Sequence, residues 1–315
     1  MEMLKRAAAN KYWQTYFTNP QTSQEEIARA KRLFSKKGKY EPLIKISQGG
    51  SGVVHAIQER RSGKLKALKI QKEESETSAF PIMHEKGMLQ ELEGFEFVPH
   101  LSSDRSSKNL EPFMVMDFLE GVALTELKKE TAKEENRKEV FQLLGKIARI
   151  YTELVKEYKI LHRDVKPGNL ILDREGQVYL VDFGIAVKES AIDKQTVSSG
   201  TAKYMPKERI AITEHRRSDI YSLAIVFFEL IEGVHPLSAQ TEETVSDVEP
   251  VMESIIDFHM RGEFQRTIDR TANLPDRFRR LLLSMTNEKA EKRPEYQEVE
   301  EEMKAVLQET NSQET

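Results

Sequence analysis

The run His162-Arg163-Asp164-Val165-Lys166-Pro167-Gly168-Asn169 decides the fold of this chain, and Asp182-Phe183-Gly184 follows thirteen residues after Asn169. Three side chains of the run can converge on one phosphoryl group. Asp164 can accept the proton of an attacking hydroxyl, and Lys166 can neutralise charge on the transferring phosphoryl. Asn169 can offer an amide oxygen to magnesium, which prefers hard oxygen ligands. The run therefore predicts a site that handles phosphate.

A second metal ligand is expected at Asp182, which directly follows the apolar segment Val-Tyr-Leu-Val at 178–181. A carboxylate at the end of a strand is well placed to bind a cation together with Asn169. Gly184 then allows the chain to turn away. A polar turn after a strand is the alternative interpretation of each motif taken alone.

The two motifs together, at this spacing, closely resemble the catalytic loop and the metal-binding loop of the protein kinases. The resemblance implies an α+β fold of two lobes, a small β-rich one and a larger α-helical one. It also implies that Asp164 is the catalytic base, supported by Lys166 and Asn169. Asn169 and Asp182 would hold Mg²⁺, for which Mn²⁺ is a possible substitute.

A glycine-rich loop is expected upstream of these motifs, and the chain has Gly-Gly-Ser-Gly at positions 49–52. By resemblance, Gly49, Gly50 and Gly52 would let backbone amides approach the phosphates of ATP. Ser47 stands where the family usually has its first glycine. A glycine cluster alone is more often a plain hairpin turn.

An ion pair between Lys69 and Glu85 is the next expected part. Lys69 lies in the β-like run Leu-Lys-Ala-Leu-Lys-Ile at 65–70 and resembles the lysine that holds the α- and β-phosphates. Glu85 comes sixteen residues later in a helical stretch, with Glu91 and Glu93 as competing partners. The alternative is a solvated surface pair, worth about 0–1 kcal/mol.

The segment Phe-Met-Val-Met-Asp-Phe-Leu-Glu-Gly at 113–121 resembles the connection between the two lobes. Met116 would lie at the back of the adenine pocket, and Asp117 and Leu119 would offer backbone groups to the adenine edge. Apolar residues expected to sandwich the base are Val54, Ala67 and Ile171. Ala123 stands near the position where many relatives carry an acidic ribose contact.

Downstream, the run from Gly200 to Met205 resembles the end of an activation segment, where Thr201 would bond to Asp164 and Lys166. Lys166 two residues after Asp164 is the serine/threonine-specific pattern. Glu208 and Arg293 are expected to form a buried structural ion pair. Asp219 is expected to brace the backbone of the catalytic loop.

The chain of 315 residues is long enough for this domain and short extensions. We predict a helical N-terminal extension over 1–39 and a kinase domain over 40–305, with lobes at 40–118 and 119–305. A capping box at Ser23 and Glu26 predicts a helix in the extension. This extension either packs on the main domain or docks a partner or regulates the enzyme. The polar tail is 306–315, and it is predicted to be disordered from about Gln308.

Composition limits the partners, the chemistry and the cellular location that we expect for the chain. The net charge is −4, and 38% of residues are hydrophobic and 32% charged, so no overall basic field predicts nucleic-acid binding. There is no cysteine, which excludes disulfides and a thiolate nucleophile. No apolar run approaches the ~18 residues of a membrane span. We therefore expect a cytoplasmic protein.

The predicted function is transfer of the γ-phosphate of ATP to serine or threonine hydroxyls of proteins. Autophosphorylation is expected in the activation segment, whose hydroxyl-bearing residues are Ser190, Thr196, Ser198, Ser199 and Thr201. Thr196, Ser198 and Ser199 are the expected sites. Arg163 could pair with such a phosphate. Two alternatives are a pseudokinase and a small-molecule kinase. Intact Lys69, Asp164 and Asp182 disfavour the first, and Lys166 with the Glu208–Arg293 pair disfavours the second.

Overall fold

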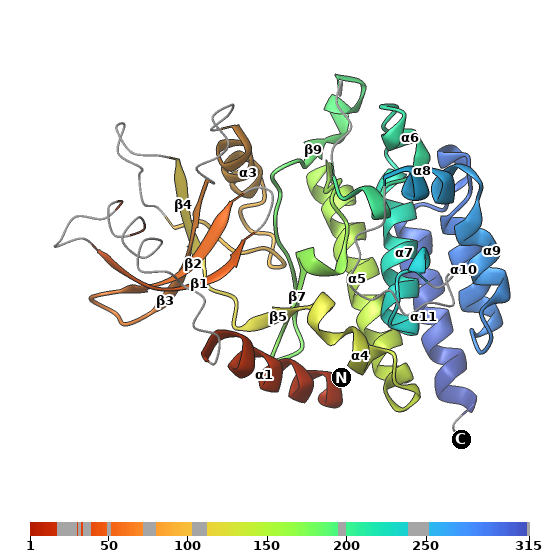
Figure 1. The fold of residues 1–315 in the computed structure, drawn as a ribbon, viewed down its shortest axis with the longest axis horizontal. Helices are drawn as coiled ribbons and strands as arrows, with labels where there is room; N and C mark the ends of the chain where they lie inside the picture. Colours follow the sequence, from red (N-terminus) through yellow and green to blue (C-terminus); the bar gives the residue numbers. More distant parts are fainter. Residues whose placement is uncertain are drawn as a thin grey trace.

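Two lobes lie side by side in the computed structural model, a sheet with one helix on one side and a helical body on the other (Figure 1). The structure describes residues 1–17, 30, 33, 39–48, 52–71, 80–102, 112–194, 200–238 and 252–313. This arrangement of a β-rich and an α-helical lobe is the predicted α+β fold.

The small lobe is an antiparallel sheet in the order β1-β2-β3-β4 with helix α3 beside it. Its elements are β1 (Tyr40–Gln48), β2 (Val53–Glu59), β3 (Leu65–Ile70), α3 (Phe80–Glu91) and β4 (Phe113–Asp117). Side chains alternate along each strand, so Leu68 and Ile70 face the outer core while Ala67 and Lys69 face the other lobe. The register pairs Ala67 with Met116.

The N-terminal extension packs on both lobes. Leu4 and Ala8 of helix α1 (Glu2–Phe17) are buried in the core of the large lobe. Ala30 and Leu33 are buried on the outer face of the small sheet. The described residues therefore agree with packing on the main domain, whereas the predicted capping box at 23–26 lies outside them.

The large lobe is built around helix α7 (Ser218–Glu232), which its other helices surround. Its helices are α4 (Lys128–Thr131), α5 (Arg137–Tyr158), α6 (Lys207–Ile210), α7 (Ser218–Glu232), α8 (Met252–Met260), α9 (Glu263–Arg270), α10 (Asp276–Met285) and α11 (Tyr296–Gln313). Helix α7 is buried from Ser218 to Ile231, and most of its residues are apolar, which suits a central helix. It ends at Gly233, whose φ of 75° is the left-handed cap that glycine adopts without strain.

Short strands hold the loops that carry the site. The two small sheets pair β5 (Gly121–Ala123), β7 (Leu170–Asp173) and β8 (Val178–Leu180) in one and β6 (Ile160–Leu161) and β9 (Val187–Lys188) in the other. The 162–169 run lies between β6 and β7, and Asp182 follows β8. Both polar motifs are thus anchored at strand ends.

The prediction of a disordered polar tail is wrong for the residues up to Gln313, because α11 continues to that residue. Val299, Met303 and Val306 are buried along one face of α11. Once this face packs, the helix extends at little cost through the polar residues that follow. The hydroxyls of Thr310 and Ser312 donate to carbonyls four residues earlier.

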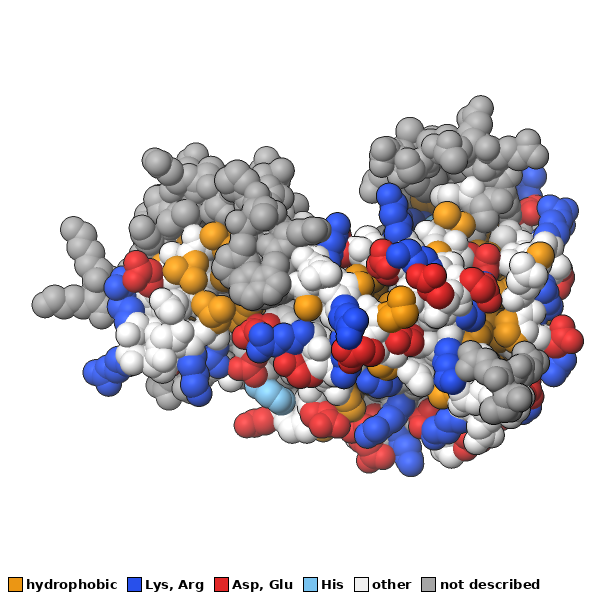
Figure 2. Space-filling model, turned by 90° about the horizontal axis from the view of Figure 1, so that it is seen from below, with side chains coloured by type: hydrophobic (Ala, Val, Ile, Leu, Met, Phe, Trp, Pro, Cys, Tyr) orange, Lys and Arg blue, Asp and Glu red, His pale blue; other side chains and the backbone are white. Residues whose placement is uncertain are grey.

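The charged surface is mixed. Lysine and arginine side chains are interspersed with aspartate and glutamate on the face shown in Figure 2. None of the helices in the described ranges combines the length and the apolarity that crossing a bilayer requires.

Candidate active site

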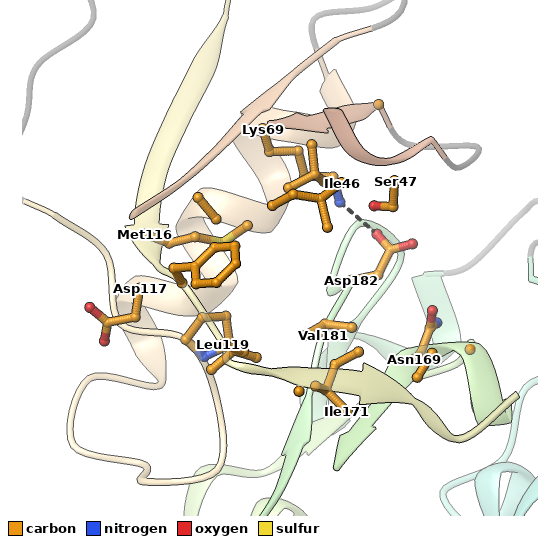
Figure 3. A pocket seen from close by; sticks show the side chains of 18 of the residues that line it. Ile46, Ser47, Lys69, Met116, Asp117, Leu119, Asn169, Ile171, Val181 and Asp182 are labelled. Atoms are coloured by element: carbon orange, nitrogen blue, oxygen red, sulfur yellow. Dashed lines mark hydrogen bonds and ion pairs between the residues drawn. The ribbon is translucent and has the colours of Figure 1, made fainter. Parts of the chain in front are cut away.

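A cavity of about 500 Å³ lies between the two lobes (Figure 3). All six residues predicted to surround the adenine line it: Val54, Ala67, Met116, Asp117, Leu119 and Ile171. The strand register explains how they meet, because Ala67 lies opposite Met116 and Ile171 comes from the sheet of the other lobe. An apolar slot of this shape suits a flat aromatic base.

The polar end of the cavity has the predicted ion pair. Lys69 Nζ donates to Glu85 Oε2 at 2.6 Å and to Asp182 Oδ1 at 3.0 Å. The competing partners are elsewhere, since Glu91 pairs with Lys188 and Glu93 is exposed. Lys69 therefore connects helix α3 to Asp182, which follows β8, across the cavity (Figure 3).

Burial and the neighbouring charges together set the pKa values of Glu85 and Lys69. It raises the pKa of Glu85 to about 7, although the neighbouring Lys69 ammonium opposes the rise. Burial alone would lower the pKa of Lys69, but the charges of Glu85 and Asp182 raise it above its usual value. Lys69 therefore stays a cation at neutral pH, as binding to phosphate requires.

The carboxylate of Asp164 receives four hydrogen bonds. The backbone N–H and the hydroxyl of Thr201 donate to Oδ1 at 2.9 and 2.8 Å. Lys166 Nζ and Asn169 Nδ2 donate to Oδ2 at 2.6 and 2.9 Å. Burial would raise the pKa of Asp164, but Lys166 and Thr201 lower it, so the group is ionised at neutral pH.

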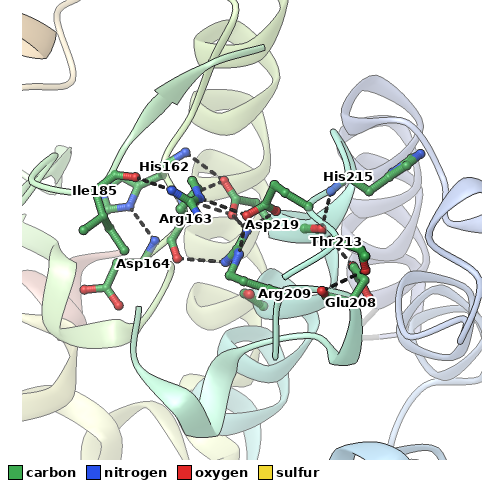
Figure 4. A network of polar contacts seen from close by, with 12 residues as sticks. His162, Arg163, Asp164, Ile185, Glu208, Arg209, Thr213, His215 and Asp219 are labelled. Carbon is green, nitrogen blue, oxygen red and sulfur yellow. Dashed lines mark hydrogen bonds and ion pairs between the residues drawn. The ribbon is translucent and has the colours of Figure 1, made fainter. Parts of the chain in front are cut away.

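The backbone of the catalytic loop is strained and is held from helix α7. Arg163 has a φ of 67°, a left-handed conformation that costs a non-glycine residue about 1–2 kcal/mol. Asp219 accepts hydrogen bonds from the backbone N–H groups of His162 at 2.8 Å and Arg163 at 3.2 Å (Figure 4). These bonds are the predicted brace, and they fix the residue that precedes Asp164.

Sequence reasoning missed two residues that bind Arg163. Its Nε donates to Glu214 Oε2 at 2.8 Å. Arg209 Nη1 donates to the carbonyl of Arg163 at 2.8 Å (Figure 4). Glu214 and Arg209 lie outside every motif, so no spacing in the sequence pointed to them. The pairing predicted for Arg163 was with a phosphate, whereas a carboxylate occupies its Nε here.

The predicted structural ion pair between Glu208 and Arg293 is present. Arg293 donates through Nη1 and Nη2 to the two carboxylate oxygens at 2.5 and 3.0 Å. Its Nε donates to the carbonyl of Asn287 at 3.0 Å. This pair ties the end of the activation segment to the chain that precedes α11.

Some predicted positions lie outside the described residues: Gly49, Gly50, Thr196, Ser198 and Ser199. Gly52 is described, with a φ of 155°, and a Cβ there would lie 2.5 Å from the carbonyl oxygen of Ile70. The close approach of β3 therefore requires glycine at this position.

Ala123 lines the cavity, and so does Glu126, which sequence reasoning did not single out. Glu126 lies in the short turn Leu124–Leu127 that follows β5. Its carboxylate is an acidic group near the place where Ala123 lacks one.

The residues present fit a magnesium ion that binds a few protein ligands and takes its other ligands from phosphate and water. Among the described residues, no cluster of three or more acidic or histidine side chains could hold a metal alone. Asn169 donates its Nδ2 to Asp164, which leaves the amide oxygen for a cation, and Asp182 lines the same cavity.

Two buried histidines support the end of the activation segment. His235 Nε2 lies 3.1 Å from the carbonyl of Lys203, and His259 Nδ1 lies 2.9 Å from the hydroxyl of Tyr221. Burial lowers the pKa of His235 to about 3, with a further contribution from Lys203, and lowers that of His259 to about 4. Both are neutral in the folded protein at pH 5.

The contribution of these two histidines to stability is therefore expected to fall as the pH is lowered below 7. The unfolded chain binds a proton at each histidine near pH 6.5, and the folded chain does not, so acid favours unfolding. Between pH 7 and pH 5, each of His235 and His259 should cost about 2 kcal/mol of unfolding free energy. Urea unfolding of wild type and of His235→Gln/His259→Gln at the two pH values measures this. Equal pH dependence in both proteins would contradict the assignment.

The comparison with protein families identifies the chain. The family described as protein kinase domain matches residues 40–303, which is most of the chain and contains every site residue named above. The chain belongs to the protein kinase domain family. The predictions of family and fold are confirmed by this match, and the two lobes are those of the kinase domain.

Serine/threonine kinases are among the relatives of this kinase domain. It is 29% identical over 228 residues, 69% of this chain, to mouse serine/threonine-protein kinase PAK 1. It is 29% identical over 275 residues, 82% of the chain, to the DNA damage-responsive serine/threonine-protein kinase RqkA of Deinococcus radiodurans. A probable serine/threonine-protein kinase of Clostridium perfringens is 31% identical over 66% of the chain. The matches span 40%, 38% and 31% of these relatives' own lengths.

Proposed function

We propose that this protein is a serine/threonine protein kinase that transfers the γ-phosphate of ATP to hydroxyls of proteins. The observation that carries the proposal is the continuous row of Glu85, Lys69 and Asp182 at one end of the cavity, beside Asn169 and Asp164. The kinase relatives support the same chemistry, and Lys166 with Thr201 supports serine/threonine acceptors.

In the proposed reaction the substrate oxygen bonds to the γ-phosphorus, the bond to the oxygen shared with the β-phosphorus breaks, and ADP leaves. Asp164 orients the hydroxyl and accepts its proton. Lys166, now 2.6 Å from Asp164, can turn to the γ-phosphate and offset its charge, which frees one carboxylate lone pair for the hydroxyl. Lys69 holds the α- and β-phosphates.

Asn169 and Asp182 would hold Mg²⁺, or Mn²⁺ in its place, which would neutralise phosphate charge when bound. The backbone of Asp117 and Leu119 would bind the adenine edge, and Glu126 is proposed to bind the ribose hydroxyls that Ala123 cannot reach. Gly49, Gly50 and Gly52 would cover the phosphates.

The chain's own activation segment is also a proposed acceptor. The segment begins at Asp182, which lines the cavity, and Thr201 near its other end is bonded to Asp164, so the chain that connects them starts and ends at the active site. The proposed sites are Thr196, Ser198 and Ser199. A cytoplasmic location and the absence of nucleic-acid binding stay predictions.

Transfer of radiolabel from ATP tests the function. We expect wild type with magnesium to label a generic basic protein on serine or threonine. Lys69→Ala should lower kcat/KM for ATP about 100-fold or more, because the cation that holds the phosphates is lost and Asp182 loses its bond to that cation. Lys188→Ala, which removes an exposed pair, is the matched control. Label on small alcohols but not on protein would favour a small-molecule kinase, and ATP binding with no transfer would favour a pseudokinase.

A further inference from the structure

Arg163, Arg209, Glu214 and Asp219 form a closed network of polar contacts. Figure 4 shows Arg209 and Asp219 beside Arg163 of the catalytic loop. All four side chains are nearly inaccessible, with exposed fractions between 0 and 4%. Two guanidinium groups face two carboxylates, so the formal charges balance. Buried charges are tolerated when they are paired in this way, and removing one member leaves another uncompensated.

Glu214 is the centre of this network. Its Oε2 accepts from the Nε atoms of both Arg163 and Arg209 at 2.8 Å, and its Oε1 accepts from Arg209 Nη2 at 2.9 Å. Burial would raise the pKa of Glu214, but Arg209 and Arg163 lower it below its usual value. Glu214 is therefore a permanent anion at neutral pH.

The network holds the catalytic loop at three points of one residue. Asp219 binds the backbone N–H of Arg163, Arg209 binds its carbonyl, and Glu214 binds its side chain. A further bond runs from Arg163 Nη1 to the carbonyl of Ile185, just beyond the metal-binding loop, at 3.3 Å. Strained backbone persists where surrounding bonds over-determine it, and these bonds hold the left-handed Arg163 that orients Asp164.

We infer that Glu214 is a built-in substitute for a phosphate, and that it positions the catalytic loop through Arg163 without phosphorylation of the activation segment. A phosphate would bring negative charge to Arg163, and Glu214 already supplies a charge-assisted bond there. Phosphorylation of the segment is then a product of the activity and not a condition for it. This inference rests on the proposed kinase function.

The first test compares two states of the wild-type chain. Phosphatase-treated protein, shown to be unphosphorylated by intact mass, is expected to keep kcat within about twofold of the phosphorylated form. A loss of tenfold or more in kcat on dephosphorylation would overturn the inference. This test uses only wild-type protein, so misfolding of a variant cannot affect it.

The second test uses Glu214→Gln, which keeps the shape and removes the charge. We expect unphosphorylated Glu214→Gln to lose about 10- to 100-fold in kcat with little change in KM for ATP, because the loop and not the adenine cavity is disturbed. Glu288→Gln, which loses only an exposed pair with Lys207, is the matched control and should behave as wild type. Unchanged kcat in Glu214→Gln would contradict the positioning role.

Hydrogen exchange separates failure of this inference from failure of the proposed function. In unphosphorylated wild type the amides of 162–164 should be protected, and in Glu214→Gln their exchange should be about tenfold faster. If no form transfers phosphate but this difference is found, the function is wrong and the positioning role stands. Equal exchange in the two proteins would overturn the inference, whatever their activity.

Discussion

Replacing Asp164 with Asn is expected to lower kcat about 100- to 10,000-fold, while KM for ATP changes by less than about threefold. Asn cannot accept the substrate proton. Its amide nitrogen would also face a donor, since Thr201 donates twice to one carboxylate oxygen and Lys166 and Asn169 donate to the other. The adenine-binding walls at Ala67 and Met116 come from the other lobe and are not disturbed.

Steady-state kinetics with a saturating protein acceptor measure this effect. Asp257→Asn is the matched control, because the same substitution there removes only an exposed pair between Asp257 of α8 and Arg261, which follows that helix. Circular dichroism should show that both variants fold. Near-wild-type turnover of Asp164→Asn would falsify the assignment of the base, because no other described carboxylate has its contacts to Lys166 and Thr201.

The parts of the site that lie within short runs could be predicted from the sequence. Asp164, Lys166 and Asn169 are close in the chain, and phosphate chemistry restricts each to one residue type. The Lys69–Glu85 pair was also predictable. Any two opposite charges can form a salt bridge, but few lysine and glutamate residues precede the catalytic run in the order that the family requires. The structure adds a second partner of Lys69, the carboxylate of Asp182.

Glu214 and Arg209 could not be predicted, for a physical reason. Of the 315 residues, 32% are charged, and most of these side chains are solvated. The side chains of Arg209 and Glu214 are buried only by tertiary packing, and Glu214 meets Arg163 across a separation of 51 residues. No local pattern records such a contact. The polar end of α11 was mispredicted for a related reason, because its order depends on buried neighbours and not on its own composition.

Replacing Arg293 with Met is expected to lower the free energy of unfolding by about 3–5 kcal/mol. The guanidinium is 1% exposed and binds both carboxylate oxygens of Glu208, so its removal leaves a largely buried charge without its cation. Contacts to the carbonyl of Asn287 and to the ring face of Tyr221 are lost as well. Ser218 still donates to Glu208, but one neutral hydroxyl cannot balance the charge.

Urea unfolding followed by circular dichroism tests this prediction against graded variants. Arg293→Lys keeps the charge but loses the planar two-pronged contact, so its loss should be intermediate. Glu208→Gln/Arg293→Met removes the stranded anion and should recover part of the stability lost in Arg293→Met. Arg261→Met, which loses an exposed pair, is the control and should change little. If Arg293→Met were no less stable than Arg261→Met, the Glu208–Arg293 pair would not be the structural tie between the activation segment and the large lobe.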